Sequence, residues 1–231
     1  MWHGACLRIY IMSMLSSNHA EALDRGVRRY PLKFQTDIPV RSRVYTGVCD
    51  SHAPSRICDF LEDLGAALGE LKFVLRSGGS GKGEMALERG ATRVLGPREV
   101  YLPWGGFNRH TSPLHRIPED AFRLCADVEP NWQYLGRGSR KLMARACLEM
   151  LGKKLSRPSL FLICWTPFGA GEGDCRTAIL LARMRGIPVL DLGKFDTLPL
   201  DDLMFHVADF LAQHGIESER MPMARQMHLA M

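Results

Sequence analysis

Short apolar runs alternate along the chain with segments whose apolar residues recur every three or four positions. A short run is typical of a β-strand, whereas the longer spacing is typical of an amphipathic helix. The runs that predict strands lie at residues 43–48, 72–75, 99–104, 160–165 and 187–192. This alternation predicts βαβ units and therefore a Rossmann-like α/β fold. We expect an open, mostly parallel sheet of about five or more strands with helices on both faces.

The run at residues 160–165 is continuously apolar and is bounded by Pro158 and Pro167. A strand of this kind is covered on both faces, so we expect it in the centre of the sheet. No internal repeat or low-complexity linker divides the chain. We predict one Rossmann-like domain over residues 35–215, an N-terminal extension of unknown role over 1–34 and a C-terminal tail over 216–231.

Charge, cysteine spacing and the length of the apolar runs favour a soluble protein that binds anions. The 231 residues carry a net charge of +5, from 30 basic and 25 acidic residues, so the surface should attract anions such as phosphates. The seven cysteines form no C-x-x-C pair, which favours reduced thiols in a cytoplasmic protein. No apolar run reaches the roughly 20 residues that span a bilayer. The N-terminal 15 residues lack the basic leader of a signal peptide, so we expect neither secretion nor membrane insertion.

Glycines gather where the predicted strands end. In an open parallel sheet, ligands bind at the carboxyl ends of the strands, and glycines there let backbone N–H groups approach an anion. The loop at residues 76–81 is the strongest candidate, because a cation, hydroxyls and flexible amides directly follow a strand. The candidate phosphate- or ligand-binding residues are Thr46, Gly47, Arg76, Ser77, Gly78, Gly79, Ser80, Gly81, Lys82, Gly106, Trp165, Thr166, Gly171 and Gly173.

Each of these features also has a purely structural interpretation. The glycine loop could be a tight turn without a ligand, and Lys82 could be a solvated helix residue. Trp104 and Trp165 could each stack a base or pack in the core or at its rim. The cations between residues 137 and 145 could reach the ligand or form a charged outer face of a helix.

Three carboxylates are candidates for catalysis. Glu84 and Glu88 lie one helical turn apart, where a carboxylate could hold a ribose hydroxyl, and Asp174 lies in the second glycine loop. The histidines show no metal-ligand spacing, and no Ser-His-Asp or G-x-S-x-G arrangement is visible. We therefore expect no metal and no required cofactor.

Several motifs together carry a family resemblance. They are Tyr45-Thr46-Gly47, Leu75-Arg76-Ser77-Gly78-Gly79 with Glu88-x-Gly90-Ala91, Glu99-Val100-Tyr101-Leu102-Pro103-Trp104-x-Gly106-Phe107-Asn108, Pro130-Asn131-Trp132, Arg140-Lys141-Leu142-x-Ala144-Arg145, Cys164-Trp165-Thr166-Pro167 and Gly186-Ile187-Pro188-Val189. Over about residues 43–193 the chain resembles the phage-type branch of the SLOG superfamily, which joins the DNA-processing protein DprA to the LOG nucleotide-processing enzymes.

The resemblance implies a Rossmann-like fold, a nucleotide-derived ligand, self-association and a phage, prophage or bacterial source. Two departures from the family pattern concern the ligand. The small-residue and aspartate pattern after the first glycines appears here as Ser80-Gly81-Lys82-Gly83-Glu84, and the second loop has Asp174 where relatives have threonine. The LOG proline-glycine-glycine signature is absent, so phosphoribohydrolase activity is not implied.

Three functions follow as hypotheses. The first is a binding module for a nucleotide or nucleotide-derived small molecule. The alternative is an enzyme that hydrolyses a nucleotide or N-glycosidic bond, for which Glu84, Glu88 and Asp174 are the candidate residues. The second alternative is DprA-like binding of single-stranded DNA through basic and aromatic side chains.

Overall fold

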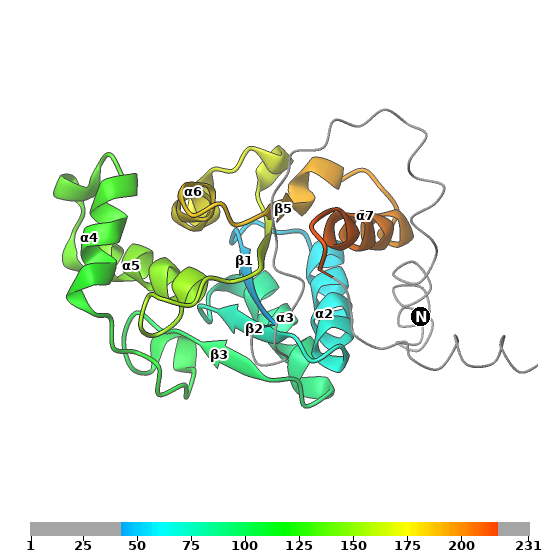
Figure 1. The fold of residues 1–231 in the computed structure, drawn as a ribbon, viewed down its shortest axis with the longest axis horizontal. Coiled ribbons are helices and arrows are strands. Elements are labelled where there is room, and N and C mark those ends of the chain that lie inside the picture. The colour runs from blue at the N-terminus through cyan, green and yellow to red at the C-terminus, as the bar shows by residue number, and fades with distance from the viewer. Residues whose placement is uncertain (1–42, 217–231) are drawn as a thin grey trace, which may run out of the picture.

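A computed structural model describes residues 43–216 of the chain. Five parallel strands form one sheet in the order β3-β2-β1-β4-β5 (Figure 1). The strands are β1 (Val44–Cys49), β2 (Val74–Ser77), β3 (Arg98–Val100), β4 (Phe161–Trp165) and β5 (Val189–Asp191). The predicted α/β Rossmann-like fold with a parallel sheet is confirmed.

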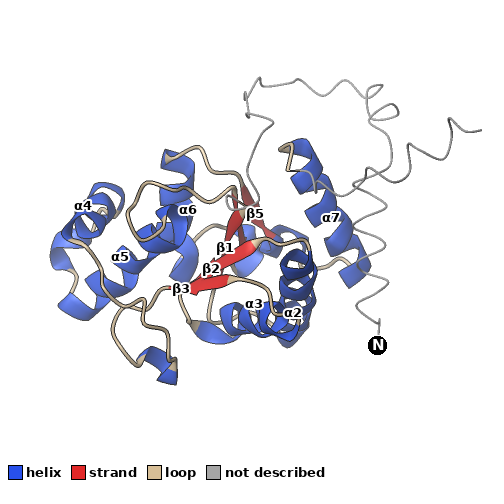
Figure 2. Cartoon of the chain, turned by 60° about the horizontal axis from the view of Figure 1, so that its bottom comes forward, coloured by secondary structure: helices blue, strands red, loops and turns tan. Residues whose placement is uncertain are grey.

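Helices cover both faces of the sheet (Figures 1 and 2). One apolar cluster joins one face to α2 (Ser55–Glu70), α3 (Gly81–Arg93) and α7 (Leu200–Gln213). A second cluster joins the other face to α5 (Arg137–Leu151) and α6 (Arg176–Met184), and α4 (Glu119–Val128) packs outside on α5. Short 3-10 turns lie at Phe107–Arg109, Trp132–Tyr134, Pro167–Gly169, Gly173–Cys175 and Leu192–Phe195.

The apolar run at 160–165 forms an interior strand, as predicted. All five residues of β4 are buried, and β4 pairs with β1 on one side and β5 on the other. The middle strand of the five is β1, which lies between β2 and β4. The Tyr45 ring of β1 stacks on Phe161 of β4, with centroids 5.5 Å apart. Aromatic packing between neighbouring strands therefore anchors the centre of the core.

The third predicted strand is shorter than its apolar run. β3 ends at Val100, whereas the run at 99–104 predicted a strand as far as Trp104. The physical reason is the position of the segment at the sheet edge: beyond Tyr101, the backbone N–H of Leu102 bonds to the Leu114 carbonyl, and Pro103 has no N–H to donate.

The ends of the chain lie largely outside the described residues. The predicted extension at 1–34 and the tail from residue 217 onward belong to that part of the sequence. Ile216 is described and is buried in the cluster that α2, α3 and α7 form. Within residues 43–216, no helix combines the length and apolarity that a membrane crossing requires.

The order of the strands creates a switch point. From β1 the chain builds β2 and β3 on one side, and then returns to the opposite side of β1 to form β4 and β5. The chain therefore changes direction across the sheet at the carboxyl ends of β1 and β4. This is where ligands bind in open α/β sheets.

Two glycines let α2 and α3 approach each other closely. A Cβ atom on Gly65 of α2 would collide with the Leu87 backbone, and one on Gly90 of α3 would collide with the Glu62 carbonyl oxygen. Both contacts are with backbone atoms, which cannot turn aside as a flexible side chain can. The position of α3, and so of the loop that precedes it, depends on this contact.

We expect Gly90→Ala to lower the free energy of unfolding by about 1–3 kcal/mol, because the added methyl forces the two helices apart. Gly138→Ala in α5 is the matched control, since nothing lies within 4 Å of its Cβ position. The control should leave stability unchanged or raise it. Chemical denaturation of both variants tests this, and equal stability would contradict the packing argument.

Candidate functional site

The carboxylate of Glu84 closes the glycine loop that follows β2. Its Oε2 atom accepts hydrogen bonds from the backbone N–H groups of Gly78 (3.1 Å) and Ser80 (2.8 Å). Gly79 and Gly81 have φ values of +62° and +61°, and this left-handed backbone shapes the loop around the carboxylate. Two of the backbone amides that the sequence predicts as phosphate ligands are thus bound by a carboxyl group of the protein itself.

Glu84 belongs to a buried polar cluster, which we call the Glu84 cluster. Arg145 of α5 donates from Nη1 to the Gly78 carbonyl (2.9 Å), and its Nε lies 2.8 Å from Oε1 of Glu149. Glu88 binds Ser77 through Oε1 (2.7 Å), and its Oε2 lies 3.1 Å from Nε2 of His110. The members of the cluster are Ser77, Glu84, Glu88, His110, Arg145 and Glu149.

The Glu84 cluster contains three carboxylates and one guanidinium. Burial is the largest influence and raises the pKa of Glu84 to about 8, while Arg145 lowers it and the Glu149 and Glu88 charges raise it again. Burial also raises the pKa of Glu149, against the opposing charge of Arg145. The cluster therefore retains a proton near neutral pH, because one guanidinium cannot balance three buried carboxylates.

Arg76 lies on the opposite face of the sheet from Ser77, since neighbouring residues of a strand alternate. Its Nε donates to Oε2 of Glu99 (2.7 Å) and its Nη1 to the Arg157 carbonyl (2.7 Å). Burial raises the pKa of Glu99, but the hydrogen bond and charge of Arg76 outweigh this and bring the pKa below its usual value. The position of Arg76 along the strand suggested a loop cation, whereas the structure places its guanidinium in an internal ion pair.

Thr46 and Gly47 lie within β1, and their side-chain positions are filled by the protein. The Thr46 hydroxyl donates to the Glu149 carbonyl (2.7 Å) and lies 2.8 Å from Oγ of Ser159. A Cβ atom on Gly47 would collide with Leu87. Because β1 continues to Cys49, the residues at its carboxyl end are Asp50, Ser51 and His52.

Asp50 fastens the end of β1 to the loop after β4. Its buried carboxylate accepts the N–H of His52 at Oδ1 (2.9 Å) and that of Asp174 at Oδ2 (3.1 Å), while Oδ2 of Asp174 accepts the N–H of Ser51 (3.1 Å). Burial raises the pKa of Asp50, but the hydrogen bonds from His52 and Asp174 outweigh it and bring the net pKa below its usual value. Asp174 is thus a structural partner of the β1 end as well as an exposed carboxylate.

The start of α3 completes this edge. A Cβ on Gly81 would lie 3.8 Å from the Cys49 carbonyl oxygen and 3.8 Å from the Ser51 Cα, and the adjacent Lys82 is exposed. We use the name switch-point edge for three segments: Asp50–His52, Ser80–Lys82 and Gly171–Asp174. The structure therefore brings together Ser80, Gly81, Lys82, Gly171 and Gly173 at one end of the sheet.

The remaining candidates occupy separate places. Thr166 is buried and donates from its hydroxyl to Asp191, while its Oγ1 accepts the N–H of Gly171 (2.9 Å). Trp165 is buried and its indole N–H donates to Oδ1 of Asp196 (2.6 Å), so it packs in the core. Gly106 (φ +75°) lies in the loop after β3, where Trp104 is 40% exposed.

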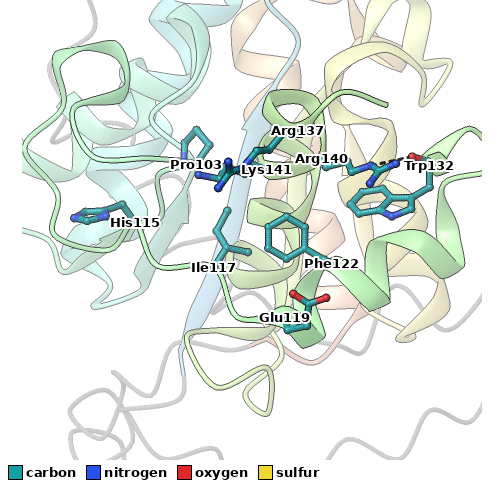
Figure 3. A pocket seen from close by; sticks show the side chains of 9 residues that line it. All are labelled: Pro103, His115, Ile117, Glu119, Phe122, Trp132, Arg137, Arg140 and Lys141. Atoms are coloured by element: carbon teal, nitrogen blue, oxygen red, sulfur yellow. Dashed lines mark hydrogen bonds between the residues drawn. The ribbon is translucent and has the colours of Figure 1, made fainter. Parts of the chain in front are cut away.

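A pocket that the sequence did not reveal lies between α4 and the N-terminal half of α5 (Figure 3). Its volume is about 510 Å³. The lining residues come from the loop after β3, from α4, from the turn at 132–134 and from α5: Pro103, His115, Ile117, Glu119, Phe122, Trp132, Arg137, Arg140 and Lys141. Only tertiary packing brings these segments together.

No protein-family model, curated protein or solved structure matches this chain. The SLOG resemblance therefore stays a prediction that rests on the motifs themselves. Within residues 43–216, no group of three or more His, Cys, Asp or Glu side chains is placed to hold a metal ion.

The raised pKa of Glu84 predicts a specific pH dependence of stability. A carboxyl whose pKa is about 8 in the folded chain and about 4.5 when unfolded keeps its proton only in the folded state between these values. The free energy of unfolding should thus fall as pH rises from about 5 to about 8, by up to about 1.4 kcal/mol per pH unit. We expect Glu84→Gln to make this decrease shallower, with a residual slope from Glu149.

Denaturant titrations at several pH values measure the slope, and Asp59→Asn on the exposed side of α2 is the matched control. A Glu84→Gln slope equal to that of the control would show that Glu84 is ionised throughout this range.

Proposed function

We propose that the chain binds a nucleotide or nucleotide-derived ligand at the switch-point edge. The observation that supports this most strongly is the convergence of three segments from different elements at the carboxyl ends of β1 and β4. Direct contacts join them: Asp50 and Asp174 exchange hydrogen bonds between two of the segments, and Gly81 of the third lies beside Ser51. Ligands of open α/β sheets bind at such a switch point.

The phosphate of the ligand is best accommodated at the first turn of α3. Glu84 already occupies the amides of Gly78 and Ser80, so those groups are not available while the loop keeps its present form. The N–H groups of the first helical turn have no acceptors within the helix, and the helix dipole adds partial positive charge. The exposed Lys82 ammonium in that turn supplies a full charge.

The other two segments would contact the sugar or base. Ser51 and His52 are exposed beside the start of α3, and Gly171 and Gly173 bring backbone close to the same edge. Gly173 has no room for a side chain, because a Cβ would collide with the Asp50 carboxylate. These groups can hydrogen-bond a polar ligand without a metal or a further cofactor.

A thermal-shift screen against mononucleotides, NAD, ADP-ribose, cyclic nucleotides and short single-stranded DNA tests the proposal. A ligand at about 100 times its Kd should stabilise the chain by about 2.7 kcal/mol, or roughly 5–10 °C in Tm. Lys82→Glu should abolish most of this shift, because it reverses the charge at the phosphate position.

Lys154→Glu is the control, an equal change of charge at an exposed turn beyond the C-terminal end of α5. If every compound leaves Tm unchanged, or if both variants respond alike, the switch-point site is wrong. A response to DNA alone that disappears steeply with salt would favour the single-stranded DNA alternative.

Hydrolysis of a nucleotide or N-glycosidic bond is the second candidate, and one observation favours it. The Nδ1 atom of His52 lies 2.8 Å from Oδ1 of buried Asp50, which leaves Nε2 of the exposed ring directed away from that carboxylate. A carboxylate that orients a histidine in this way is the usual arrangement of a general base. Of the carboxylates that the sequence favoured, Glu84 and Glu88 are buried and hydrogen-bonded within the cluster, and Asp174 alone is exposed.

If the chain is a hydrolase, we expect His52→Gln to lower kcat by about 10²–10⁴-fold while ligand binding is largely retained, because a general base acts on the chemical step. Chromatographic detection of free base, sugar phosphate or inorganic phosphate measures turnover. His214→Gln beyond the end of α7 is the control. Absence of any product with the wild-type chain, or full activity of His52→Gln, would eliminate this candidate.

A further inference from the structure

The pocket between α4 and α5 is distinct from the switch-point edge, and it carries its own chemistry. We propose that it binds a small organic phosphate whose anionic group pairs with Arg137 and Lys141 and whose apolar body lies on Ile117 and Phe122. The proposal is independent of the nucleotide site, since none of the nine lining residues belongs to the switch-point edge.

Two cations in the pocket have no acidic partner among residues 43–216. Arg137 and Lys141 stand one helical turn apart on α5 and line the same end of the pocket (Figure 3). Arg140, by contrast, is fixed: it donates to the carbonyls of Trp132 (3.2 Å) and Gln133 (3.0 Å), and its guanidinium carbon lies 5.6 Å from the Trp132 ring centroid. Arg140 therefore fixes the turn at 132–134 as one wall of the pocket. Arg137 and Lys141 remain available to an anion.

The place of these cations in the helix is unfavourable without a ligand. All three lie in the first turn and a half of α5, where the helix dipole disfavours positive charge. The first turn contains no acidic residue, and Gly136 at the N-cap offers no side chain to the free backbone N–H groups. A bound phosphate would accept hydrogen bonds from these backbone N–H groups and would neutralise the charges of Arg137 and Lys141.

The rest of the pocket is apolar in the middle and acidic at the far end. In the view of Figure 3, Ile117 and Phe122 lie between the cations and Glu119. Phe122 packs edge-on against Trp132, with ring centroids 6.4 Å apart. An apolar floor can hold a hydrocarbon or ring, and the Glu119 carboxylate, which has no partner in the described structure, can accept a hydrogen bond from a donor on the ligand.

Core contacts between α4 and α5 hold the walls of the pocket together. Cys125 of α4 lies against Cys147 of α5 with their sulfur atoms 3.3 Å apart, and its thiol also donates to the Met143 carbonyl (3.2 Å). A volume of about 510 Å³ falls in the range of small-molecule sites and far exceeds the space that inorganic phosphate needs. Size and polarity together favour an organic phosphate over a bare ion.

Isothermal titration calorimetry with phenyl phosphate, inorganic phosphate and phenol tests the proposal. Phenyl phosphate should bind at least about tenfold more tightly than either fragment, because it combines the ionic and apolar contacts. The double variant Arg137→Gln/Lys141→Gln should weaken its binding by at least about tenfold, and Phe122→Leu should reduce its advantage over inorganic phosphate.

Lys153→Gln/Lys154→Gln, which removes the same charge at the other end of α5, is the control and should bind as the wild type does. Arg137→Gln/Lys141→Gln should leave the thermal shift by the nucleotide unchanged, which separates this pocket from the nucleotide site. The proposal is overturned if phenyl phosphate shows no heat of binding up to about 10 mM, if inorganic phosphate binds equally well, or if the Arg137/Lys141 variant binds like the control.

Discussion

The Glu84 carboxylate on two loop amides is the contact on which the carboxyl edge of the sheet depends. Burial raises the pKa of this carboxyl to about 8, and Arg145 of α5 opposes the rise with its charge while also binding the Gly78 carbonyl. Glu149 lies one turn further along α5, and its backbone carbonyl accepts a hydrogen bond from the Thr46 hydroxyl of β1. One network therefore joins β1, β2, α3 and α5 through the glycine loop.

This constraint also shifts the expected place of a ligand. A glycine loop after a parallel strand commonly receives a phosphate on its amides, but here an internal carboxylate takes two of them. A positive group that is not used in this way is the start of α3 with Lys82, beside the linked ends of β1 and β4. Arg137 and Lys141 at the start of α5, which have no acidic partner among residues 43–216, are the proposed second place for an anion.

The fold was predictable because short apolar runs alternate along the chain with segments of helical spacing, and β4, which is buried on both faces, is the clearest of these runs. The site was only partly predictable.

The apolar run predicted that the first strand ends at Val48, so Thr46 and Gly47 were the candidate ligand residues. The strand continues to Cys49, and the polar groups that follow it, Asp50 and His52, were not predicted. The partners of Arg76, Glu99 and the Arg157 carbonyl, come from segments distant in the sequence. The spacing of residues along the strand therefore did not predict that its guanidinium points into the protein. The pocket between α4 and α5 needs segments that only tertiary packing joins, although basic residues at a helix N-terminus without an acidic partner were a signal for it.

A crystal structure of the chain with the nucleotide that binds most tightly tests the central claim most directly. The account predicts the phosphate within hydrogen-bonding distance of the first-turn amides of α3 and of Lys82, with the Glu84 carboxylate still on Gly78 and Ser80. A phosphate bound to the Gly78 and Ser80 amides, with Glu84 displaced, would contradict it.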